Sequence, residues 1–379
     1  MYIRTIQKQV TERLFQGRVI VIFGARRVGK TTMCKDILDK YPSKDTQYYN
    51  CEDSIIQEAM SQNNPERMKD FFGKKKLIVL DEAQTIPEIG KRLKIMIDTF
   101  PGIQIIATGS SSFELANQVG EPLVGRQFTF WMHPLTLSEI SQNPKYTSNL
   151  QIQHNFDKIL RFGLYPSIFD KNIDEATELL SEMTESYLFK DILAHENIKK
   201  SKLLSDLLKL LALSIGSELS LNWLAQRLNT SVVTVDKYIY LLEQTFIIFR
   251  LNTLNRNLKK EISKGFKVYF WDLGIRNQVI NSFNTLETRN DVGALWENFC
   301  IAERLKKIKN EKLHANSYFW RTYDQQEIDY IEEKDGGFLA LECKWSENKK
   351  AKAPKIFLET YPSTVFEVIN NQNWWKYLV

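Results

Sequence analysis

The sequence lacks several features that would place it in a specialised class of protein. It has four cysteines in 379 residues, and none lies in a C-x-x-C pair, so neither a zinc site nor a disulfide framework is indicated. No segment approaches the roughly 20 uninterrupted apolar residues that span a bilayer. The first 18 residues also lack the apolar stretch and cleavage site of a signal peptide. We therefore expect a cytoplasmic protein with no membrane span.

The net charge and the length of the chain exclude fewer classes of protein than these missing features do. The net charge of +5 is small for 379 residues, so only local clusters of charge could indicate a nucleic-acid partner. Domains have roughly 150 residues on average, which predicts two or three domains in this chain. Polar segments at 141–155 and 281–291 separate stretches of different pattern. We predict three domains, at residues 1–140, 156–280 and 290–379.

The first predicted domain has the pattern of an α/β fold with a parallel sheet. Residues 18–23 form a short β-branched run that ends at a glycine, as in a strand buried on both faces. Helix-like stretches, the first of them at 30–40, alternate with further apolar runs. The other strands of this sheet are expected at 47–51, 76–80 and 104–108.

A phosphate-binding motif follows the first expected strand. Such a loop needs glycines, so that its backbone N–H groups can point at the anion, and a helix N-terminus behind it. Lys30 is predicted to contact the β and γ phosphates of ATP, and the Thr31 hydroxyl to bind Mg²⁺. The nine predicted nucleotide-binding residues are consecutive: Gly24, Ala25, Arg26, Arg27, Val28, Gly29, Lys30, Thr31 and Thr32. The motif predicts a P-loop NTPase.

Two carboxylates end the expected strand at 76–80. Asp81 is predicted to hold the magnesium ion, and Glu82 to polarise the attacking water, a division of roles that indicates ATP hydrolysis. Thr108 ends the next strand, where its hydroxyl could sense the γ-phosphate or orient the water. A turn rich in serine and threonine is an equally good interpretation of Thr108.

The middle of the chain has the pattern of a winged helix. Helices are expected at 203–215, 220–228 and 232–244, followed by strands at 246–251 and 267–271. Four basic residues between these strands are predicted to contact DNA phosphates: Arg256, Lys259, Lys260 and Lys264. A solvated charged loop is the alternative, and a winged helix used only for packing or protein contacts remains open.

The last segment carries acidic residues in a pattern that can hold a metal ion. Asp329 lies in an expected strand, and the next strand places Glu342 and Lys344 on one face because side chains alternate with period two. Glu297, on the preceding expected helix, is a third candidate ligand. Lys344 could stabilise the attacking water or the developing charge.

The sequence resembles a widespread prokaryotic family of AAA-type ATPases whose C-terminal half is a domain of unknown function. The matching segments are residues 24–32, 80–84, 108–111, 123–126, 133–135, 163–166 and 188–192. The resemblance implies a P-loop domain, a winged helix and a nuclease-like domain, with Arg126 as a candidate sensor of the γ-phosphate. Ala25 stands where the family usually has proline, which leaves the phosphate loop intact. The order Glu297, Asp329, Glu342-x-Lys344 resembles restriction-endonuclease-like PD-(D/E)XK nucleases.

The leading hypothesis is an ATPase that couples ATP and Mg²⁺ to DNA binding, and to DNA cleavage where the nuclease-like domain is active. The alternative is a signalling or toxin-like ATPase switch whose C-terminal domains bind protein and whose nuclease-like fold is inactive. The sequence leaves open whether the chain forms a homo-oligomer. Stimulation of ATP hydrolysis by DNA would separate the two hypotheses.

Overall fold

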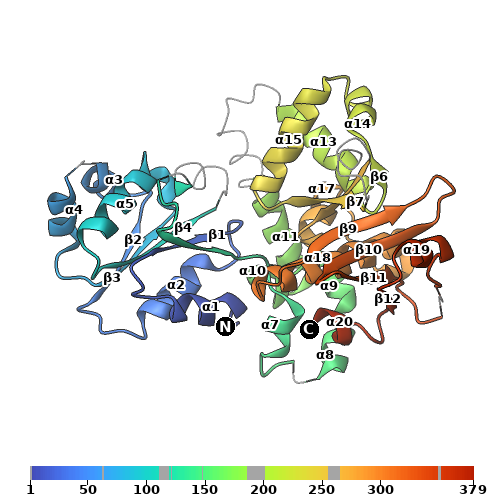
Figure 1. Ribbon diagram of the computed structural model, residues 1–379, viewed down its shortest axis with the longest axis horizontal. Helices are drawn as coiled ribbons and strands as arrows, with labels where there is room; N and C mark the ends of the chain where they lie inside the picture. Colours follow the sequence, from blue (N-terminus) through green and yellow to red (C-terminus); the bar gives the residue numbers. More distant parts are fainter. Residues whose placement is uncertain are drawn as a thin grey trace. The chain divides into compact units, whose positions relative to one another are not determined.

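The computed structural model divides into two compact units, residues 3–133 and residues 134–379 (Figure 1). It describes residues 2–61, 64–110, 119–120, 122–146, 148–185, 201–254, 265–348 and 351–379. Within these residues, we find no helix that combines the length and the apolar character needed to cross a membrane.

The N-terminal unit is built on a parallel sheet with the strand order β2-β3-β4-β1-β5. Its strands are β1 (Val19–Phe23), β2 (Thr46–Asn50), β3 (Leu77–Asp81), β4 (Gln104–Gly109) and β5 (Gln127–Trp131). Its helices are α1 (Thr5–Glu12), α2 (Lys30–Leu38), α3 (Ser54–Ser61), α4 (Pro65–Phe72), the 3₁₀ helix η1 (Ala83–Thr85) and α5 (Ile89–Thr99). The α/β fold and the four expected strands are confirmed, whereas β5 was not predicted.

The three central strands explain why the apolar runs are short and continuous. Every residue of β1, β3 and β4 is buried, because these strands have a neighbour on each side and helices on the faces of the sheet. Their carboxyl ends, Phe23, Asp81 and Gly109, lie at the same edge because the strands are parallel. This edge is where an open α/β sheet places its ligand site.

The C-terminal unit contains a mixed sheet with the order β12-β11-β10-β9-β7-β8-β6. Its strands are β6 (Glu218–Leu219), β7 (Ile248–Thr253), β8 (Phe266–Phe270), β9 (Asn316–Arg321), β10 (Glu327–Lys334), β11 (Gly337–Cys343) and β12 (Thr364–Ile369). The helices before β6 are α7 (Leu137–Ser141), α8 (Asn149–His154), α9 (Phe156–Phe162), α10 (Pro166–Phe169), α11 (Ile173–Met183) and α13 (Ser201–Leu213). The later helices are α14 (Leu221–Arg227), α15 (Val232–Gln244), α17 (Leu273–Val279), the 3₁₀ helix η3 (Leu286–Thr288), α18 (Val292–Asn310), α19 (Lys355–Thr360) and α20 (Trp375–Leu378).

The helices α13, α14 and α15 together with β6, β7 and β8 have the connectivity of a winged helix. Both β6 and β7 pair antiparallel with β8, and α15 spans the residues predicted for it. The strand β7 also pairs in parallel with β9, through Asn252 with Tyr318 and Thr253 with Phe319. As a result, the regions predicted as second and third domains share one continuous sheet (Figure 1).

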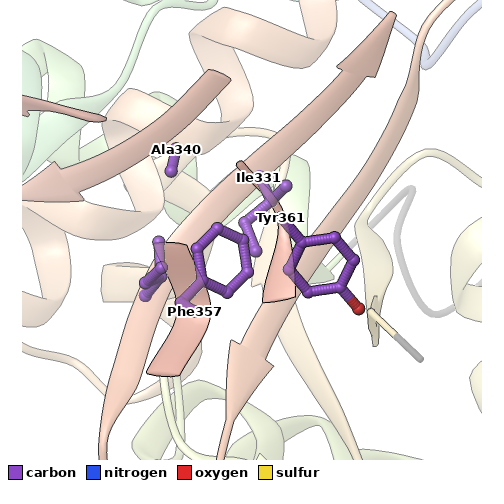
Figure 2. Packing of buried hydrophobic residues seen from close by; sticks show 5 residues of the cluster. Ile331, Ala340, Phe357 and Tyr361 are labelled. Atoms are coloured by element: carbon purple, nitrogen blue, oxygen red, sulfur yellow. The ribbon is translucent and has the colours of Figure 1, made fainter. Parts of the chain in front are cut away.

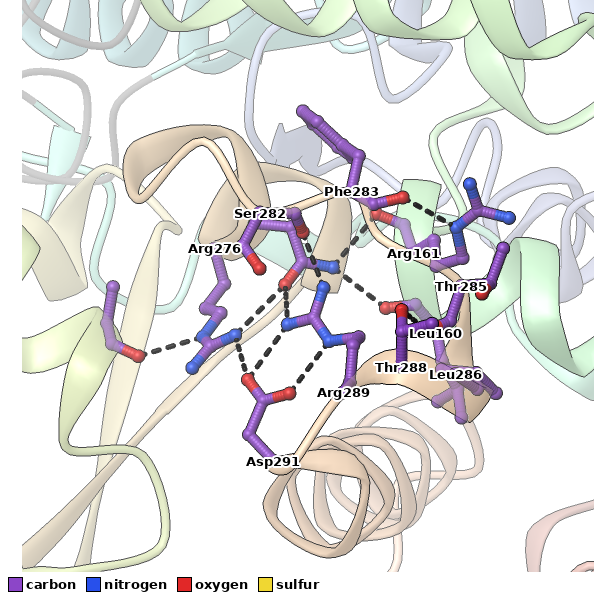
Figure 3. A network of polar contacts seen from close by, with 12 residues as sticks. Leu160, Arg161, Arg276, Ser282, Phe283, Thr285, Leu286, Thr288, Arg289 and Asp291 are labelled. Carbon is purple, nitrogen blue, oxygen red and sulfur yellow. Dashed lines mark hydrogen bonds and ion pairs between the residues drawn. The ribbon is translucent and has the colours of Figure 1, made fainter.

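A buried polar network joins the helices of this unit (Figure 3). The Asn277 amide donates to the backbone carbonyls of Leu160 and Arg161, at 2.9 Å each. Arg276 and Arg289 both donate to the carboxylate of Asp291, each at 2.7 Å. The segment 281–291, which we expected to separate two domains, is therefore anchored into the core of one unit.

An apolar cluster packs against β10 and β11 of the seven-stranded sheet (Figure 2). Ile328 and Ile331 of β10 and Ala340 of β11 are fully buried against Phe357 of α19 and Tyr361 beyond it. The rings of Phe357 and Tyr361 lie 4.8 Å apart. This packing explains why α19 forms despite being only six residues long, since short helices depend on tertiary contacts.

Part of the polar segment at 141–155, which we expected to separate two domains, is helical. The helix α8 (Asn149–His154) lies there, and it begins at a capping box in which Ser148 and Gln151 satisfy each other's backbone N–H groups. Ile152 of this helix is buried. The polar composition that suggested a linker comes from the cap and from the exposed face of the helix.

Candidate nucleotide-binding site and carboxylate cluster

The loop between β1 and α2 requires glycine at two positions. A Cβ atom on Gly24 would lie 2.2 Å from the backbone oxygen of Met132, so no larger residue fits without moving the neighbouring strand. Gly29 has φ of +99°, a backbone conformation that only glycine adopts without strain. The loop therefore has the geometry that a phosphate-binding turn needs at the N-terminus of α2.

Lys30, the first residue of α2, is buried with its amine inside this loop. Its Nζ donates to the carbonyl oxygens of Gly24, at 2.7 Å, and Ala25, at 3.1 Å. Burial lowers the pKa of Lys30, whereas the carboxylates of Glu82 and Asp81 raise it. The side chain thus places a cationic group against the loop that would surround a phosphate.

Asp81, at the end of β3, accepts hydrogen bonds from three hydroxyl groups. Thr31 and Tyr48 donate to its Oδ2, each at 2.6 Å, and Thr108 donates to its Oδ1. Only 4% of Asp81 is exposed, so its charge would be costly to bury without these donors. The structure thus brings together three residues predicted from separate segments: Thr31, Asp81 and Thr108.

Tyr48 was missed by the sequence analysis. It lies on β2, where it pairs with Val79 of β3, and this places its ring next to Asp81. Burial, with a further contribution from Asp81, raises the pKa of Tyr48, so the phenol stays protonated and donates. A tyrosine in a strand is ordinary, so the sequence contained no signal for this contact.

Glu82 follows Asp81 in a left-handed conformation, with φ of +53°. Its carboxylate accepts a hydrogen bond from the Gln84 amide at 2.6 Å, and the same amide nitrogen lies 3.2 Å from the Ser110 hydroxyl. The Glu82 backbone N–H donates to Thr108 at 3.3 Å. The strained turn therefore directs Glu82 away from the strand and holds it at the sheet edge, next to the phosphate loop.

These residues are suited to bind Mg²⁺ and a nucleoside triphosphate. Lys30 supplies a cation against the glycine loop, and Thr31 with Asp81 supplies oxygen ligands of the kind that Mg²⁺ prefers. Glu82 is a carboxylate beside this set and is not one of the groups bonded to Thr31. The structure brings these residues together, and their roles in binding and hydrolysis stay predictions.

Arg4 is a second residue that the sequence analysis missed. Its guanidinium is buried and donates to the carbonyl oxygens of Val28 in the loop and His133 after β5, at 2.5 Å each. These bonds join the residue before α1 to the phosphate loop and to the end of the sheet. Arg4 lies 24 positions from Val28, so no local pattern could indicate it.

Arg126 does not lie at this site. It precedes β5, and its carbonyl oxygen accepts the N–H of Val19 at the start of β1. The phosphate loop follows the other end of β1, about 16 Å away for a five-residue strand. The Arg126 guanidinium donates instead to Asp98 at 2.7 Å, with both side chains about half exposed. Within one chain, Arg126 is therefore not placed to sense a γ-phosphate.

Sequence comparison agrees with the geometry of this unit. Residues 16–141 match a family described as an AAA domain. The N-terminal unit carries an AAA-type P-loop ATPase domain. Behind this AAA-type domain, residues 153–286 and 292–373 match two families described as domains of unknown function, DUF8612 and DUF4143.

Relatives that span both the AAA-type domain and the C-terminal unit occur in archaea and bacteria. The uncharacterized protein MJ1544 of Methanocaldococcus jannaschii is 26% identical over 349 residues, covering 86% of this chain and 75% of the relative. The uncharacterized protein Rv2008c of Mycobacterium tuberculosis is 24% identical, covering 90% and 73%. Among solved structures, the Walker-type ATPase paby2304 of Pyrococcus abyssi is 13% identical with a TM-score of 0.49, covering 73% of this chain and 94% of that chain.

The predicted nuclease residues lie together in the C-terminal unit, but they have other partners. Lys267 of β8 is fully buried, and its amine contacts Glu297 at 3.0 Å and also Glu327. The Tyr269 hydroxyl donates to the same oxygen of Glu297 at 2.6 Å. Asp329 accepts the backbone N–H of Cys343 at 2.8 Å, and Lys344 donates to Glu342 at 2.6 Å.

These contacts bear on the metal site predicted from Glu297, Asp329 and Glu342, which stays a prediction. No group of three or more His, Cys, Asp or Glu side chains within the described residues is arranged to hold a metal ion. Lys267 places its ammonium 3.0 Å from the Glu297 carboxylate. The acidic cluster is thus neutralised in part by two lysines of the chain itself, Lys267 and Lys344.

The stability of the C-terminal unit should depend on pH through Glu297. Burial and the neighbouring Asp329 raise the pKa of Glu297 from 4.5 to about 7. The folded state then keeps its proton to higher pH than the unfolded state, so the free energy of unfolding should fall as pH rises from 4.5 to 7. Glu297→Gln should flatten this dependence in urea unfolding followed by tryptophan fluorescence, since seven of the eight tryptophans lie after residue 133.

Glu359→Gln provides the control for this experiment, because Glu359 is exposed on α19. Asp329 and Glu342 also have raised pKa values, through burial first, so part of the slope should survive in Glu297→Gln. Equal slopes for the wild type and Glu297→Gln between about pH 5 and 8 would contradict this assignment.

The four basic residues predicted to contact DNA, Arg256, Lys259, Lys260 and Lys264, lie outside the described residues. They fall between Leu254, just after β7, and Gly265, just before β8. Their role stays a prediction.

Proposed function

We propose that this protein is a magnesium-dependent ATPase whose C-terminal unit binds DNA, so that the nucleotide state of one unit is coupled to DNA contact by the other. The observation that carries the proposal is the hydroxyl of Thr31 bonded at 2.6 Å to Asp81, beside the buried amine of Lys30. A threonine and an aspartate that are fifty residues apart in the sequence meet here at the phosphate loop. This pairing is what magnesium coordination in P-loop enzymes needs.

Each residue of the site has one role in the proposed hydrolysis. Lys30 and the N–H groups of the loop bind the phosphates, while Thr31 and Asp81 hold the metal ion in place. Bound Mg²⁺ and ATP supply the electrophilic γ-phosphorus and the charge that neutralises its oxygens. Glu82 accepts a proton from the water that attacks, and Gln84 with Ser110 orients its carboxylate.

The DNA-binding part of the proposal is supported by the winged-helix connectivity of the C-terminal unit. The helix α15 begins at the capping residue Ser231 and exposes Val233, Asp236, Lys237 and Tyr240. The segment between β7 and β8, where a winged helix has its wing, contains four basic residues and one acidic residue in positions 255–264. Basic residues in the segment between the last two strands of a winged helix are expected to contact DNA phosphates.

Replacing Arg256, Lys259, Lys260 and Lys264 together with alanine should weaken DNA binding. Binding releases about one counterion for each phosphate that the protein neutralises, so the slope of log Kd against log salt should fall by up to about four on duplex DNA. The weakening should be similar for unrelated sequences, because phosphate contacts carry no sequence information. Fluorescence anisotropy between about 50 and 300 mM salt measures both quantities.

Four exposed lysines of the N-terminal unit provide the matched control: Lys8, Lys40, Lys44 and Lys74. Their replacement removes the same charge and should leave the salt slope near that of the wild type. An unchanged slope in the variant of residues 256–264 would favour the rival hypothesis, in which the C-terminal unit binds protein.

Coupling between the units is tested by ATP hydrolysis with and without duplex DNA. We expect DNA to change the turnover rate, and we expect the alanine variant of the basic segment to lose this effect while it keeps its basal rate. Turnover that is indifferent to duplex, single-stranded and branched DNA would also favour the protein-binding switch. Cleavage is not part of the proposal, because Glu297 is held by Lys267 and Tyr269.

A further inference from the structure

The C-terminal unit has an open pocket of about 650 Å³ between the winged helix and the turn that joins β9 to β10. One wall comes from residues after α13 and from α14, and includes Ser217, Glu218 and Trp223. The other wall comes from the end of β9 and the following turn, and includes Arg321, Thr322 and Tyr323. Its volume lies within the range of roughly 300 to 1,000 Å³ that is usual for small-ligand sites.

Two aromatic rings give this pocket surfaces on which a planar group can stack. Trp223 is 37% exposed and Tyr323 is 96% exposed. The guanidinium of Arg227 lies over the Trp223 ring, 5.7 Å from its centroid, which adds a cation to that surface. Large aromatic side chains that remain exposed within one pocket, and are not buried in a core, indicate a binding surface.

The polar groups between the rings offer both donors and acceptors. The Arg321 guanidinium lies 3.7 Å from Glu218 and 3.6 Å from Glu327, distances of ion pairs that are longer than good hydrogen bonds. A cation and a carboxylate are therefore presented side by side, with hydroxyls of Ser217 and Thr322 nearby in the lining. This combination suits a flat ligand whose edge carries donors and acceptors, and it does not suit a multiply charged anion, since Arg321 is already balanced by two carboxylates.

We propose that this pocket binds one unpaired nucleotide of a nucleic-acid strand, with its base stacked on Trp223 and Tyr323 and its polar edge on Glu218 and Arg321. The inference rests on the proposed DNA-binding function of this unit and adds to it a preference for a strand whose base is accessible. A base inside a duplex has both faces covered by its neighbours, so a paired strand cannot use the two rings. The pocket thus distinguishes single-stranded ends, gaps or loops from intact duplex.

The charges around the pocket predict how its binding depends on salt. One cation, Arg227, forms no ion pair within the described part of the chain, so the pocket contributes about one phosphate contact at most. Replacing a ring should therefore weaken binding at all salt concentrations and leave the salt slope nearly unchanged. This differs from the expected effect of the basic segment, whose replacement changes the slope.

The test uses the full chain and short fluorescein-labelled strands, about 12 nucleotides long, of one sequence, as DNA, as RNA and as a blunt DNA duplex. Trp223→Ala should weaken single-strand binding by about tenfold, and Tyr323→Ala by several-fold, as expected when base stacking is removed. Trp223→Phe keeps a ring and should recover most of the affinity. Comparison of the DNA and RNA arms identifies which strand the pocket favours.

Phe15→Ala is the matched control, because Phe15 is a 47% exposed aromatic residue of the N-terminal unit and does not line the pocket. It should bind single strands as the wild type does. Tyr323 is so exposed that its replacement should leave folding intact, which keeps the test valid even where Trp223→Ala lowers the melting temperature. Circular dichroism of each variant checks this.

Three outcomes would overturn the proposal: single-strand binding by Trp223→Ala and Tyr323→Ala within about twofold of the wild type, an equal weakening on the blunt duplex, or no single-strand binding by the wild type. Duplex binding together with DNA-dependent ATP turnover would then leave the proposed function standing without the pocket. Conversely, absence of basal ATP hydrolysis would contradict the proposed function, while the strand-binding measurements would still report on the pocket.

Discussion

Lys30→Ala is expected to abolish ATP binding, and Glu82→Gln is expected to bind ATP and Mg²⁺ nearly as the wild type does but to hydrolyse ATP far more slowly. The alanine variant removes the buried cation whose amine lies against the carbonyls of the phosphate loop. The glutamine variant keeps the size of the Glu82 side chain but cannot accept a proton from water. General-base catalysis contributes about 10²- to 10⁴-fold, so kcat should fall by that factor.

Binding and turnover must be measured separately to test these roles. Equilibrium titration with a fluorescent ATP analogue gives the Kd, and phosphate release gives kcat. Lys44→Ala and Glu88→Gln are matched controls, because both residues are exposed in the same unit. Wild-type turnover by Glu82→Gln would exclude Glu82 as the base, and tight ATP binding by Lys30→Ala would contradict the assigned phosphate site.

Lys267→Met is expected to destabilise the C-terminal unit by about 3 to 5 kcal/mol, the usual result of removing one partner from a buried ion pair. Burial alone would lower the pKa of Lys267, but Glu297, Glu327 and Asp329 raise it well above its ordinary value, so the amine is charged in the folded protein. Methionine has a similar length and no charge. The variant would leave the carboxylates of Glu297 and Asp329 without the cation beside them.

The pH dependence of this effect gives an independent check. Glu297 holds its proton more readily than an exposed glutamate, and removal of Lys267 takes away the charge that favours its ionised form. The destabilisation should therefore be smaller at about pH 5 than at about pH 8, and Glu297→Gln in the same chain should restore part of the stability. Lys334→Met, at an exposed position of β10, is the control. A destabilisation below roughly 1 kcal/mol for Lys267→Met would contradict a net role for the buried pair.

The elements that the sequence predicted well are those set by local pattern. The helix α15 follows from a capping serine and an apolar period, and β1 follows from a β-branched run that ends at Gly24. The meeting of Thr31 and Asp81 also follows from local pattern, because parallel strands bring their carboxyl ends to one edge.

The residues that the sequence did not predict act across long separations. Tyr48 reaches Asp81 from the edge strand β2, and Arg4 joins two carbonyls that are 105 positions apart, at 28 and 133. Neither contact produces a periodic pattern in the sequence. The position of Arg126, away from the phosphate loop, could not be predicted for a related reason. A short motif does not specify at which end of a strand its residue lies.

The sequence could not show the partners of the predicted metal ligands, because a charge pattern on two strands does not reveal which side chain faces it from a third strand. The alternation predicted Glu342 and Lys344 on one face of their strand, and Lys344 donates to Glu342 at 2.6 Å. The sequence 266–270 reads as an apolar strand with one lysine, and only the fold shows that this lysine points at Glu297. The position of β8 in the sheet order decides the chemistry of the cluster.

The pairing of β7 with β9 also bears on how this chain could have been assembled in evolution. A fragment that began near residue 290 would keep β9 but lose its neighbour, and the backbone N–H and C=O groups that now bond to residues 252–254 would form an open edge. Such an edge recruits strands from other molecules and promotes aggregation. The segments that carry β7 and β9 therefore depend on each other to complete the sheet. We expect them to have been inherited together.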